Sequence, residues 1–299
     1  MSPTPPMPQM PQMPQMPQMD QAYTLVAFHA HPDDESLLTG GTLARAAAEG
    51  HRVVLVVATC GERGLAGSQD GVGAELADRR MRELDAAAEA LGCARVVPLG
   101  YGDSGLHPSP DDAEAFANAD VETAAKALAD MLRDEAADVL LIYDRHGGYG
   151  HPDHVQVHRV GTRAAALAGT PVVLEATVPS RLFRTALGLL RLVGHALGSS
   201  SPLPVHEVFA DPGSVTHRVS VTRFLSAKRA ALAAHASQTR ADGQTRVLTR
   251  LLRLPPPLFA LALGHEWYIE QGRVAGPTQT DVFATLREAT RTPAPARRP

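Results

Sequence analysis

The sequence predicts an α/β fold: a Rossmann-like, mostly parallel sheet with helices on both faces. Five short apolar runs, rich in β-branched residues, are typical of buried strands, at 23–29, 53–58, 95–99, 139–143 and 171–176. Segments of helical length separate these runs, at 42–49, 74–91, 121–135 and 155–168. Strands that alternate with helices pair in parallel, and a parallel sheet needs helices over both of its faces.

Local signals mark where the elements begin and end. Pro32 ends pairing soon after the first strand, which reads YTLVAFH. Gly40 and Gly41 precede the first helix, and Gly50 stops it. Along 74–91 the apolar residues recur at roughly helical spacing, at Leu76, Met81, Leu84, Ala88 and Leu91. These signals support the alternation of strands and helices in the first half of the chain.

Composition narrows the class of protein. The chain has 299 residues, of which 44% are hydrophobic, so it can bury one sizeable core. The net charge is −4 and no basic stripe interleaves with aromatic residues, which argues against a nucleic-acid partner. Cys60 and Cys93 are the only cysteines; they make no disulfide framework and predict a reducing, cytoplasmic location. The sequence allows a homo-oligomer but does not determine the oligomeric state.

The two ends read as tails on one domain. Residues 7–19 repeat Met-Pro-Gln, so residues 1–20 are expected to be a disordered tail and not a signal peptide. The domain is expected over 21–275, with additional helical segments at 180–213 and 241–264, and a second tail over 276–299. The Arg/Leu-rich part of the first segment, 181–198, is too short and too charged to be transmembrane. It predicts helical packing over the sheet or, alternatively, a lid, an oligomer contact or a membrane-surface helix.

Two polar clusters follow the first and fourth strands. His31, Asp33 and Asp34 come after the first strand, and His151 and His154 come after the fourth. In open α/β sheets, ligands bind beyond the carboxyl ends of the strands where the strand order reverses. If the first and fourth strands are neighbours at that point, the two loops meet there. Each cluster alone also fits a turn or a helix cap, but the pair favours a metal site.

The residue types fit a catalytic zinc centre. Such a site takes three His, Asp or Glu ligands and leaves one position open. His31, Asp34 and His154 supply two imidazoles and a carboxylate. Asp33 is then free to accept a proton from water, and His151 is free to protonate a leaving group, with Asp153 or another carboxylate to orient it.

Three motifs resemble those of the zinc-dependent LmbE-like, or PIG-L, N-acetylglucosaminyl deacetylases. They are AHPDDE at 30–35, TCGERG at 59–64 and GGYGHPDH at 147–154. The resemblance implies hydrolysis of the acetamide of an amino sugar or a related N-acetylated small molecule.

The same resemblance implies roles for individual residues. It makes His31, Asp34 and His154 the zinc ligands and Asp33 the general base. It makes His151 a general acid or oxyanion partner, and it makes Tyr149 a mobile hydroxyl near the substrate carbonyl.

Other polar residues are weaker candidates. Arg63, in the loop after the second strand, is expected either to hold an acidic or hydroxylated substrate or to be a solvated loop arginine. Asp103, after the third strand, is a candidate contact for sugar hydroxyls. Arg79, Arg80 and Arg82 share a helix with acidic residues, so surface pairing is expected for them; the alternative is that one of them reaches the site.

The sequence also allows two other functions. One is an amidase acting on a larger thiol-sugar conjugate, and another is a non-catalytic metal-binding homologue. Asp33 and His151 argue against the second, because a pure binder needs neither. A nucleotide-dependent oxidoreductase is disfavoured, because HPDDE follows the first strand where a glycine-rich phosphate turn is required. The identity of the substrate is left open.

Overall fold

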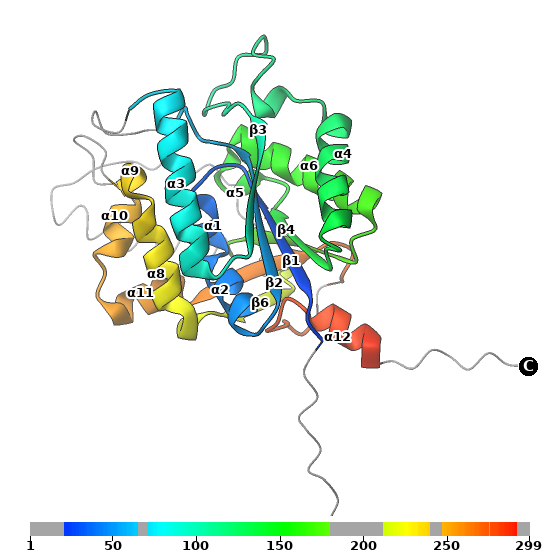
Figure 1. The fold of residues 1–299 in the computed structure, drawn as a ribbon. Helices are drawn as coiled ribbons and strands as arrows, with labels where there is room; N and C mark the ends of the chain where they lie inside the picture. The colour runs from blue at the N-terminus through cyan, green and yellow to red at the C-terminus, as the bar shows by residue number, and fades with distance from the viewer. Residues whose placement is uncertain (1–20, 65–70, 180–211, 240–246, 275, 292–299) are drawn as a thin grey trace, which may run out of the picture.

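A central mixed sheet organises the protein in the computed structural model (Figure 1). The structure describes residues 21–64, 71–179, 212–239, 247–274 and 276–291. Within these ranges the sheet has seven strands in the order β3-β2-β1-β4-β5-β7-β6. Their bounds are β1 Thr24–His29, β2 Arg52–Thr59, β3 Arg95–Tyr101, β4 Val139–Tyr143, β5 Val172–Thr177, β6 His217–Ser220 and β7 His265–Glu270.

Helices follow most of the strands. The α-helices are α1 Asp34–Leu38, α2 Gly40–Ala48, α3 Ala74–Leu91, α4 Val121–Asp134, α5 Gly147–Gly150, α6 Pro152–Ala168, α8 Leu225–Ala234, α9 Ala236–Thr239, α10 Val247–Leu252, α11 Pro256–Leu263 and α12 Ala284–Arg291. Short 3₁₀ turns are η1 Phe116–Asn118, η2 Pro212–Ser214 and η3 Thr222–Phe224. The four helices expected between the strands, at 42–49, 74–91, 121–135 and 155–168, therefore form within a few residues of their predicted bounds.

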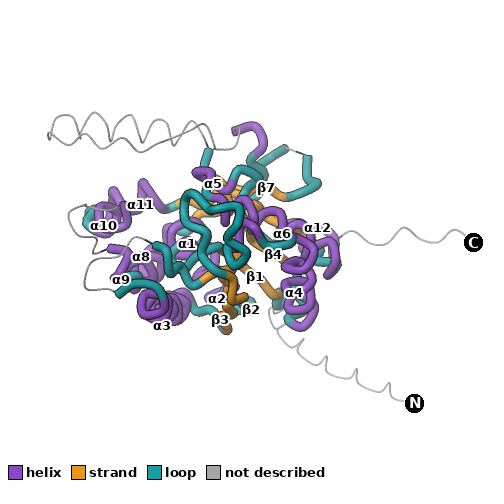
Figure 2. Tube along the Cα trace, turned by 90° about the horizontal axis from the view of Figure 1, so that it is seen from above, coloured by secondary structure: helices purple, strands orange, loops and turns teal. Residues whose placement is uncertain are grey.

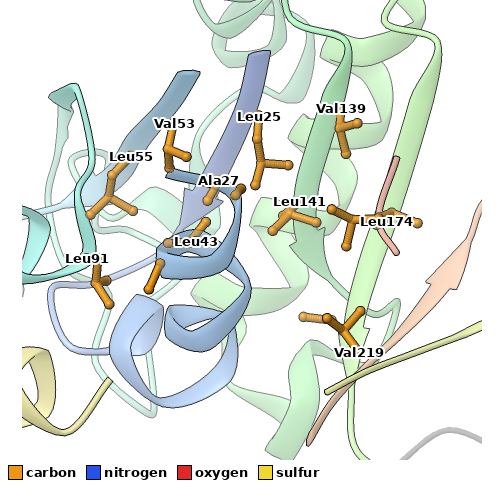
Figure 3. Close-up of a cluster of buried hydrophobic side chains, with 14 of the residues drawn as sticks. Leu25, Ala27, Leu43, Val53, Leu55, Leu91, Val139, Leu141, Leu174 and Val219 are labelled. Carbon is orange, nitrogen blue, oxygen red and sulfur yellow. The ribbon is translucent and has the colours of Figure 1, made fainter. Parts of the chain in front are cut away.

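Successive side chains of a strand point to opposite faces of the sheet, so the core consists of two layers. Leu25 and Ala27 of β1 face one layer, which α2, α3 and α8 cover. Val26 and Phe28, between and beyond them, face the other layer, which α4 and α6 cover. Figure 2 shows these helix groups on opposite sides of the strands. In Figure 3, Leu43 of α2 reaches toward the strand side chains. Helices cover both faces, as predicted.

The strand order reverses between β1 and β4. β1 pairs in parallel with β2 on one side and with β4 on the other, and β5 pairs in parallel with β4. The condition under which the two polar loops meet, that the first and fourth strands are neighbours, is therefore fulfilled. The loops that leave their carboxyl ends therefore emerge side by side.

The antiparallel edge was not predicted. β7 pairs antiparallel with β5, and β6 pairs antiparallel with β7. β6 has only four residues, and both strands come after the alternation of strands and helices has ended. The sheet is thus mostly parallel, with two additional strands on one side.

The prediction of a tail over 276–299 is wrong for its described part. Val282 and Phe283 are buried, and the ring of Phe283 stacks on that of Tyr23 with centroids 5.1 Å apart. α12 follows directly. Burial of these apolar side chains against the start of β1 holds the segment on the domain.

The expected helical segments fall partly within the described ranges. α10 and α11 lie inside 241–264; Pro255 is the N-cap residue of α11, and Pro256 and Pro257 form its first turn. The predicted tail over 1–20 and nearly all of 180–213 lie outside the described residues. None of the helices in the described ranges combines the length and apolar character needed to cross a bilayer.

Candidate active site

The AHPDDE segment turns sharply where β1 ends. Asp33 has φ 109° and ψ −30°, and it is the N-cap residue of the short helix α1, where a loop was expected. A positive φ is costly for a residue with a side chain, on the order of 1–3 kcal/mol, and persists where neighbours impose it. The turn directs Asp33 and Asp34 to different partners, although they are adjacent in the chain.

Asp34 lies between two imidazoles. Its Oδ2 is 3.3 Å from Nδ1 of His31 and 3.3 Å from Nε2 of His154. All three side chains are largely or fully buried. The structure thus brings together the three residues predicted to bind the metal, from the ends of β1 and β4.

The nitrogen atoms of His154 are oriented for a ligand. Its Nδ1 donates to the carbonyl of Gly147 at 3.1 Å, so Nε2 carries the lone pair of the neutral ring. That Nε2 is buried and makes no hydrogen bond within the described part of the chain. A Cβ at Gly147 would lie 2.8 Å from Cβ of His154, so the close approach requires glycine. The donor set, two imidazoles and one carboxylate, fits a divalent cation such as zinc.

The other ring nitrogen of His31 is held by carboxylates. Nε2 of His31 lies 3.1 Å from Asp153 Oδ2 and 3.5 Å from Asp103 Oδ1. Although burial opposes it, hydrogen bonds to Asp103, Asp153 and Asp34 raise the pKa of His31 well above its usual value. Carboxylates behind a ligating histidine fix its ring orientation in metal sites. Asp153 therefore orients His31, and its side chain does not orient His151 as suggested.

His151 is the N-cap residue of α6 and faces both other histidines. Its ring centroid is 4.7 Å from that of His31 and 5.0 Å from that of His154. Its Nδ1 accepts the backbone N–H of Asp153 at 3.2 Å, which places the proton of a neutral ring on Nε2. Burial and the two neighbouring imidazoles lower the pKa of His151 to about 4. At neutral pH it is an uncharged hydrogen-bond donor, which favours the oxyanion role over that of an acid.

Tyr149 lies at the exposed side of this cluster. Its side chain is exposed, and its ring centroid is 5.1 Å from that of His154 and 5.9 Å from that of His151. Gly148 and Gly150 on either side of it have positive φ. Tyr149 therefore borders the histidines from a glycine-rich turn, where it is open to a ligand.

The two predicted substrate contacts differ in position. Asp103 lies beside His31 and accepts the backbone N–H groups of Arg63 and Gly105 at 3.1 and 2.8 Å. The Arg63 side chain extends away and pairs with Asp112 near the surface. The structure thus brings Asp103 into the site, and it leaves only the backbone of Arg63 there.

Surface pairing was the wrong expectation for Arg80. Its side chain is only 3% exposed, and it donates to the carbonyls of Gly61 and Pro32. Its Nη2 is also 3.3 Å from Oδ2 of Asp33. Burial raises the pKa of Asp33 to about 6, against the opposing charge of Arg80.

The sequence pattern of α3 indicates that Arg80 is buried. It lies four residues after Leu76 and four before Leu84, so it shares their buried side of α3. A charged residue at a core position of an amphipathic helix indicates a buried partner. The partner here is the loop that carries Asp33.

Comparison with known proteins finds a family model and relatives that are all named as deacetylases. The family model described as GlcNAc-PI de-N-acetylase (PIG-L) matches residues 26–165. The 1D-myo-inositol 2-acetamido-2-deoxy-alpha-D-glucopyranoside deacetylase of Acidothermus cellulolyticus is 38% identical over 288 residues, which cover 87% of this chain and 94% of the relative. The enzyme of the same name from Nocardiopsis dassonvillei is 37% identical, over 86% of this chain and 99% of the relative.

Solved structures share the fold. N,N'-diacetylchitobiose deacetylase from Pyrococcus horikoshii has a TM-score of 0.57 and 21% identity, over 85% of each chain. A 4-carboxy-2-hydroxymuconate hydratase from Pseudomonas putida has a TM-score of 0.54 and 18% identity, over 86% of this chain and 100% of its own. The fold therefore carries more than one reaction, and function must be argued from the site. On the match to the family model and the near full-length similarity to curated relatives, the chain belongs to the LmbE-like PIG-L family of de-N-acetylases.

Proposed function

We propose that the protein is a zinc-dependent N-deacetylase that hydrolyses the acetamide of an N-acetylated amino sugar. The observation that carries the proposal is the divergence of Asp33 and Asp34. Asp34 lies between two imidazoles, whereas Asp33 points to Arg80 and keeps its carboxylate apart from them. One carboxylate can therefore hold a metal while the next remains free to act as a base. The described relatives, which are named as deacetylases of an acetamido sugar, support this reaction.

Three residues would hold the metal. Nε2 of His154 has its lone pair free, Asp34 offers Oδ2, and Nδ1 of His31 faces Asp34. Asp153 keeps the opposite nitrogen of His31 engaged. The chemistry that a zinc ion supplies when bound is Lewis acidity, which polarises a carbonyl oxygen and lowers the pKa of water.

The remaining side chains divide the proton transfers and charge stabilisation. Asp33 accepts a proton from the attacking water, and the same proton is then available to the departing amine nitrogen. The Nε2–H of neutral His151 donates to the oxyanion that develops on the acetyl carbonyl. The hydroxyl of Tyr149, at the exposed edge, is a second donor to that oxygen.

Asp103 is proposed to accept hydrogen bonds from sugar hydroxyls, because it lies beside His31. The ion pair of Arg63 with Asp112 disfavours the corresponding role for Arg63. The substrate proposed first is 1D-myo-inositol 2-acetamido-2-deoxy-α-D-glucopyranoside, because the curated relatives carry its name. The cytoplasmic location is a further proposal, supported by two free cysteines among the described residues.

The test is acetate release by zinc-loaded protein from a panel of compounds. The panel holds the inositol glycoside, N-acetylglucosamine, N,N'-diacetylchitobiose and a thiol-sugar conjugate. We expect equal amounts of acetate and free amine from the inositol glycoside, and turnover about 10²- to 10⁴-fold lower with Asp33→Asn. Cleavage of the conjugate alone would favour the amidase alternative, and zinc binding without turnover of any compound would favour the non-catalytic homologue.

A further inference from the structure

The segment HASQ, at 235–238, has no part in the chemistry proposed above, yet it is buried beside the site. His235, Ser237 and Gln238 are each less than 5% exposed. They come where α8 ends and α9 begins, about 200 residues after the AHPDDE turn. His235 and Ser237 pair with acidic side chains of α1 and α3, Glu35 and Glu83, so this corner joins distant parts of the chain.

His235 is paired with Glu35. Its Nε2 donates to Oε1 of Glu35 at 2.7 Å, and both side chains are fully buried. The hydroxyl of Ser36 donates to the same oxygen. The second carboxylate oxygen, Oε2, accepts the backbone N–H of Asp33 at 2.9 Å. Glu35 thus connects the HASQ corner to the peptide group that precedes the proposed base.

This hydrogen bond replaces an ordinary helix cap. An Asp at the N-cap position commonly accepts hydrogen bonds from the first amides of its helix through its own carboxylate. Asp33 is the N-cap residue of α1, but its side chain accepts none of those bonds. Glu35 instead reaches back to the N-cap amide, as the acidic residue of a capping box does. The carboxylate of Asp33 is thereby left for Arg80 and the site.

We infer that Glu35 and His235 are positioning residues: the buried pair holds the amide of Asp33 and so fixes the positive φ that keeps its carboxylate beside Arg80 and away from the amides of α1. This inference rests on the proposed role of Asp33 as general base. Asp33 and Ala136 are the only non-glycine residues with positive φ among those described. Without the bond from its amide, Asp33 can relax to an ordinary cap, with its carboxylate turned toward the amides of α1.

The variants that test the inference are Glu35→Ala, Glu35→Gln and, as a control, Glu83→Gln. The control residue is a second buried acid at the same corner. Glu83 accepts the backbone N–H and the hydroxyl of Ser237 at 2.8 and 2.6 Å, but it does not contact Asp33. It reports any general loosening of the corner.

Zinc content, kcat, KM and the exchange rate of the Asp33 amide proton are measured for each variant. With Glu35→Ala we expect kcat to fall about 10- to 100-fold, the cost of a misplaced catalytic group. We expect KM and zinc content to stay unchanged and the Asp33 amide to exchange faster. Glu35→Gln retains an oxygen for that amide, and its NH₂ can donate to His235 in the other tautomer. It should therefore restore most of kcat, and Glu83→Gln should leave kcat unchanged.

An unchanged kcat in folded, zinc-loaded Glu35→Ala would overturn the inference, as would an equal fall in Glu83→Gln. Should Glu35→Ala not fold, His235→Leu tests the same bond, because it releases the carboxylate of Glu35. Asp33→Asn is assayed in parallel. Wild-type turnover in Asp33→Asn would contradict the proposed mechanism, in which Asp33 is the base, whereas a loss of about 10²- to 10⁴-fold beside a fully active Glu35 variant would overturn only the positioning role.

Discussion

The ring of Tyr143 lies flat against the imidazole of His154, with centroids 4.1 Å apart and planes 6° apart. Tyr143 ends β4, and His154 lies in the first turn of α6, so the contact fixes a proposed metal ligand against the sheet. The hydroxyl of Tyr143 also accepts the backbone N–H of Ala30 at 3.1 Å, at the end of β1. One side chain therefore links the two loops that supply the ligands.

Tyr143→Leu should weaken zinc binding, because His154 loses the surface that holds its ring. Changes in the layer behind metal ligands typically cost about 10- to 100-fold in affinity. Tyr143→Phe keeps the ring contact and loses only the hydroxyl, so the affinity loss should be smaller. Competition with a chromophoric chelator measures both. Equal affinity in the Leu variant and the wild type would show that the stacking does not orient His154.

Lys228 and Glu266 form a buried ion pair away from the site. Lys228 Nζ lies 2.6 Å from Glu266 Oε1, and both side chains are almost fully buried. Glu266 also accepts the backbone N–H groups of Gly41 and Thr42 at 2.8 Å, at the start of α2. The carboxylate therefore has several donors, whereas the ammonium depends on this carboxylate.

Glu266→Gln should destabilise the protein more than Lys228→Met. The first change leaves a buried ammonium without its counter-charge, which typically costs about 3–5 kcal/mol of the free energy of unfolding. The second leaves a carboxylate that keeps its amide donors, and the loss should be about 1–3 kcal/mol. Urea denaturation of both variants gives the order. A larger loss of stability in Lys228→Met than in Glu266→Gln would contradict this expectation.

Arg80 should contribute to stability far more than Arg79, its neighbour on α3. Arg80→Met leaves the buried carbonyl of Pro32 without its donor among the described residues, at about 1–3 kcal/mol, while the carbonyl of Gly61 keeps the backbone N–H of Gly64. The Arg79 side chain is partly exposed and lies 4.0 Å from Glu83, so Arg79→Met should change stability by less than about 1 kcal/mol. Thermal melting of the two variants is the comparison. Similar melting temperatures would mean that Arg80 does not anchor these loops.

Because of His217, we expect the folded protein to lose stability in acid. Its imidazole is fully buried on β6, and Nδ1 makes a hydrogen bond with the hydroxyl of Thr216 at 2.9 Å. Burial and the nearby Arg273 lower the pKa of His217 to about 4. The charges of Asp281 and Glu288 oppose this lowering of the pKa, and Oε2 of Glu270 lies 3.7 Å from Nε2 of His217.

The sign of the effect follows from the lowered pKa. Between about pH 4 and 6.5 the unfolded chain binds a proton at His217 that the folded protein does not. Stability from this group is therefore complete above pH 6.5 and falls as the pH drops to 4, by up to about 3 kcal/mol. His217→Gln should remove this part of the pH dependence. Denaturation of both proteins at pH 7 and pH 5 tests it, and an identical pH dependence would contradict the assignment.

The sequence predicted the meeting of the two polar loops because each lies at the end of a strongly apolar strand. HPDDE and HPDH could then be placed at one edge of a parallel sheet, and β1 and β4 are indeed neighbours there. The antiparallel strands β6 and β7 gave no comparable signal, because β6 has only four residues and the buried positions of β7 include Glu266 and Glu270. α12 was missed because a few buried residues, Phe283 among them, hold a segment that is otherwise polar.

The separate roles of the acidic residues could be predicted only in part. Adjacent Asp33 and Asp34 suggested one ligand and one base, and the positive φ of Asp33 shows how the backbone separates them. Nothing in the spacing indicates that Asp153 holds His31, since that choice depends on the packing of α6 against the loop after β3. Partners 100 or more residues apart are set by the fold, and local patterns do not contain them.

The separation of roles between Asp33 and Asp34 is tested most directly by zinc content and turnover of Asp33→Asn and Asp34→Asn, measured side by side after dialysis. Asp33→Asn should keep zinc and lose turnover by about 10²- to 10⁴-fold, because the proton acceptor is removed. Asp34→Asn should lose zinc as well, as should His31→Ala and His154→Ala, because each removes a ligand. Stoichiometric zinc in Asp34→Asn, or wild-type turnover in Asp33→Asn, would contradict the account.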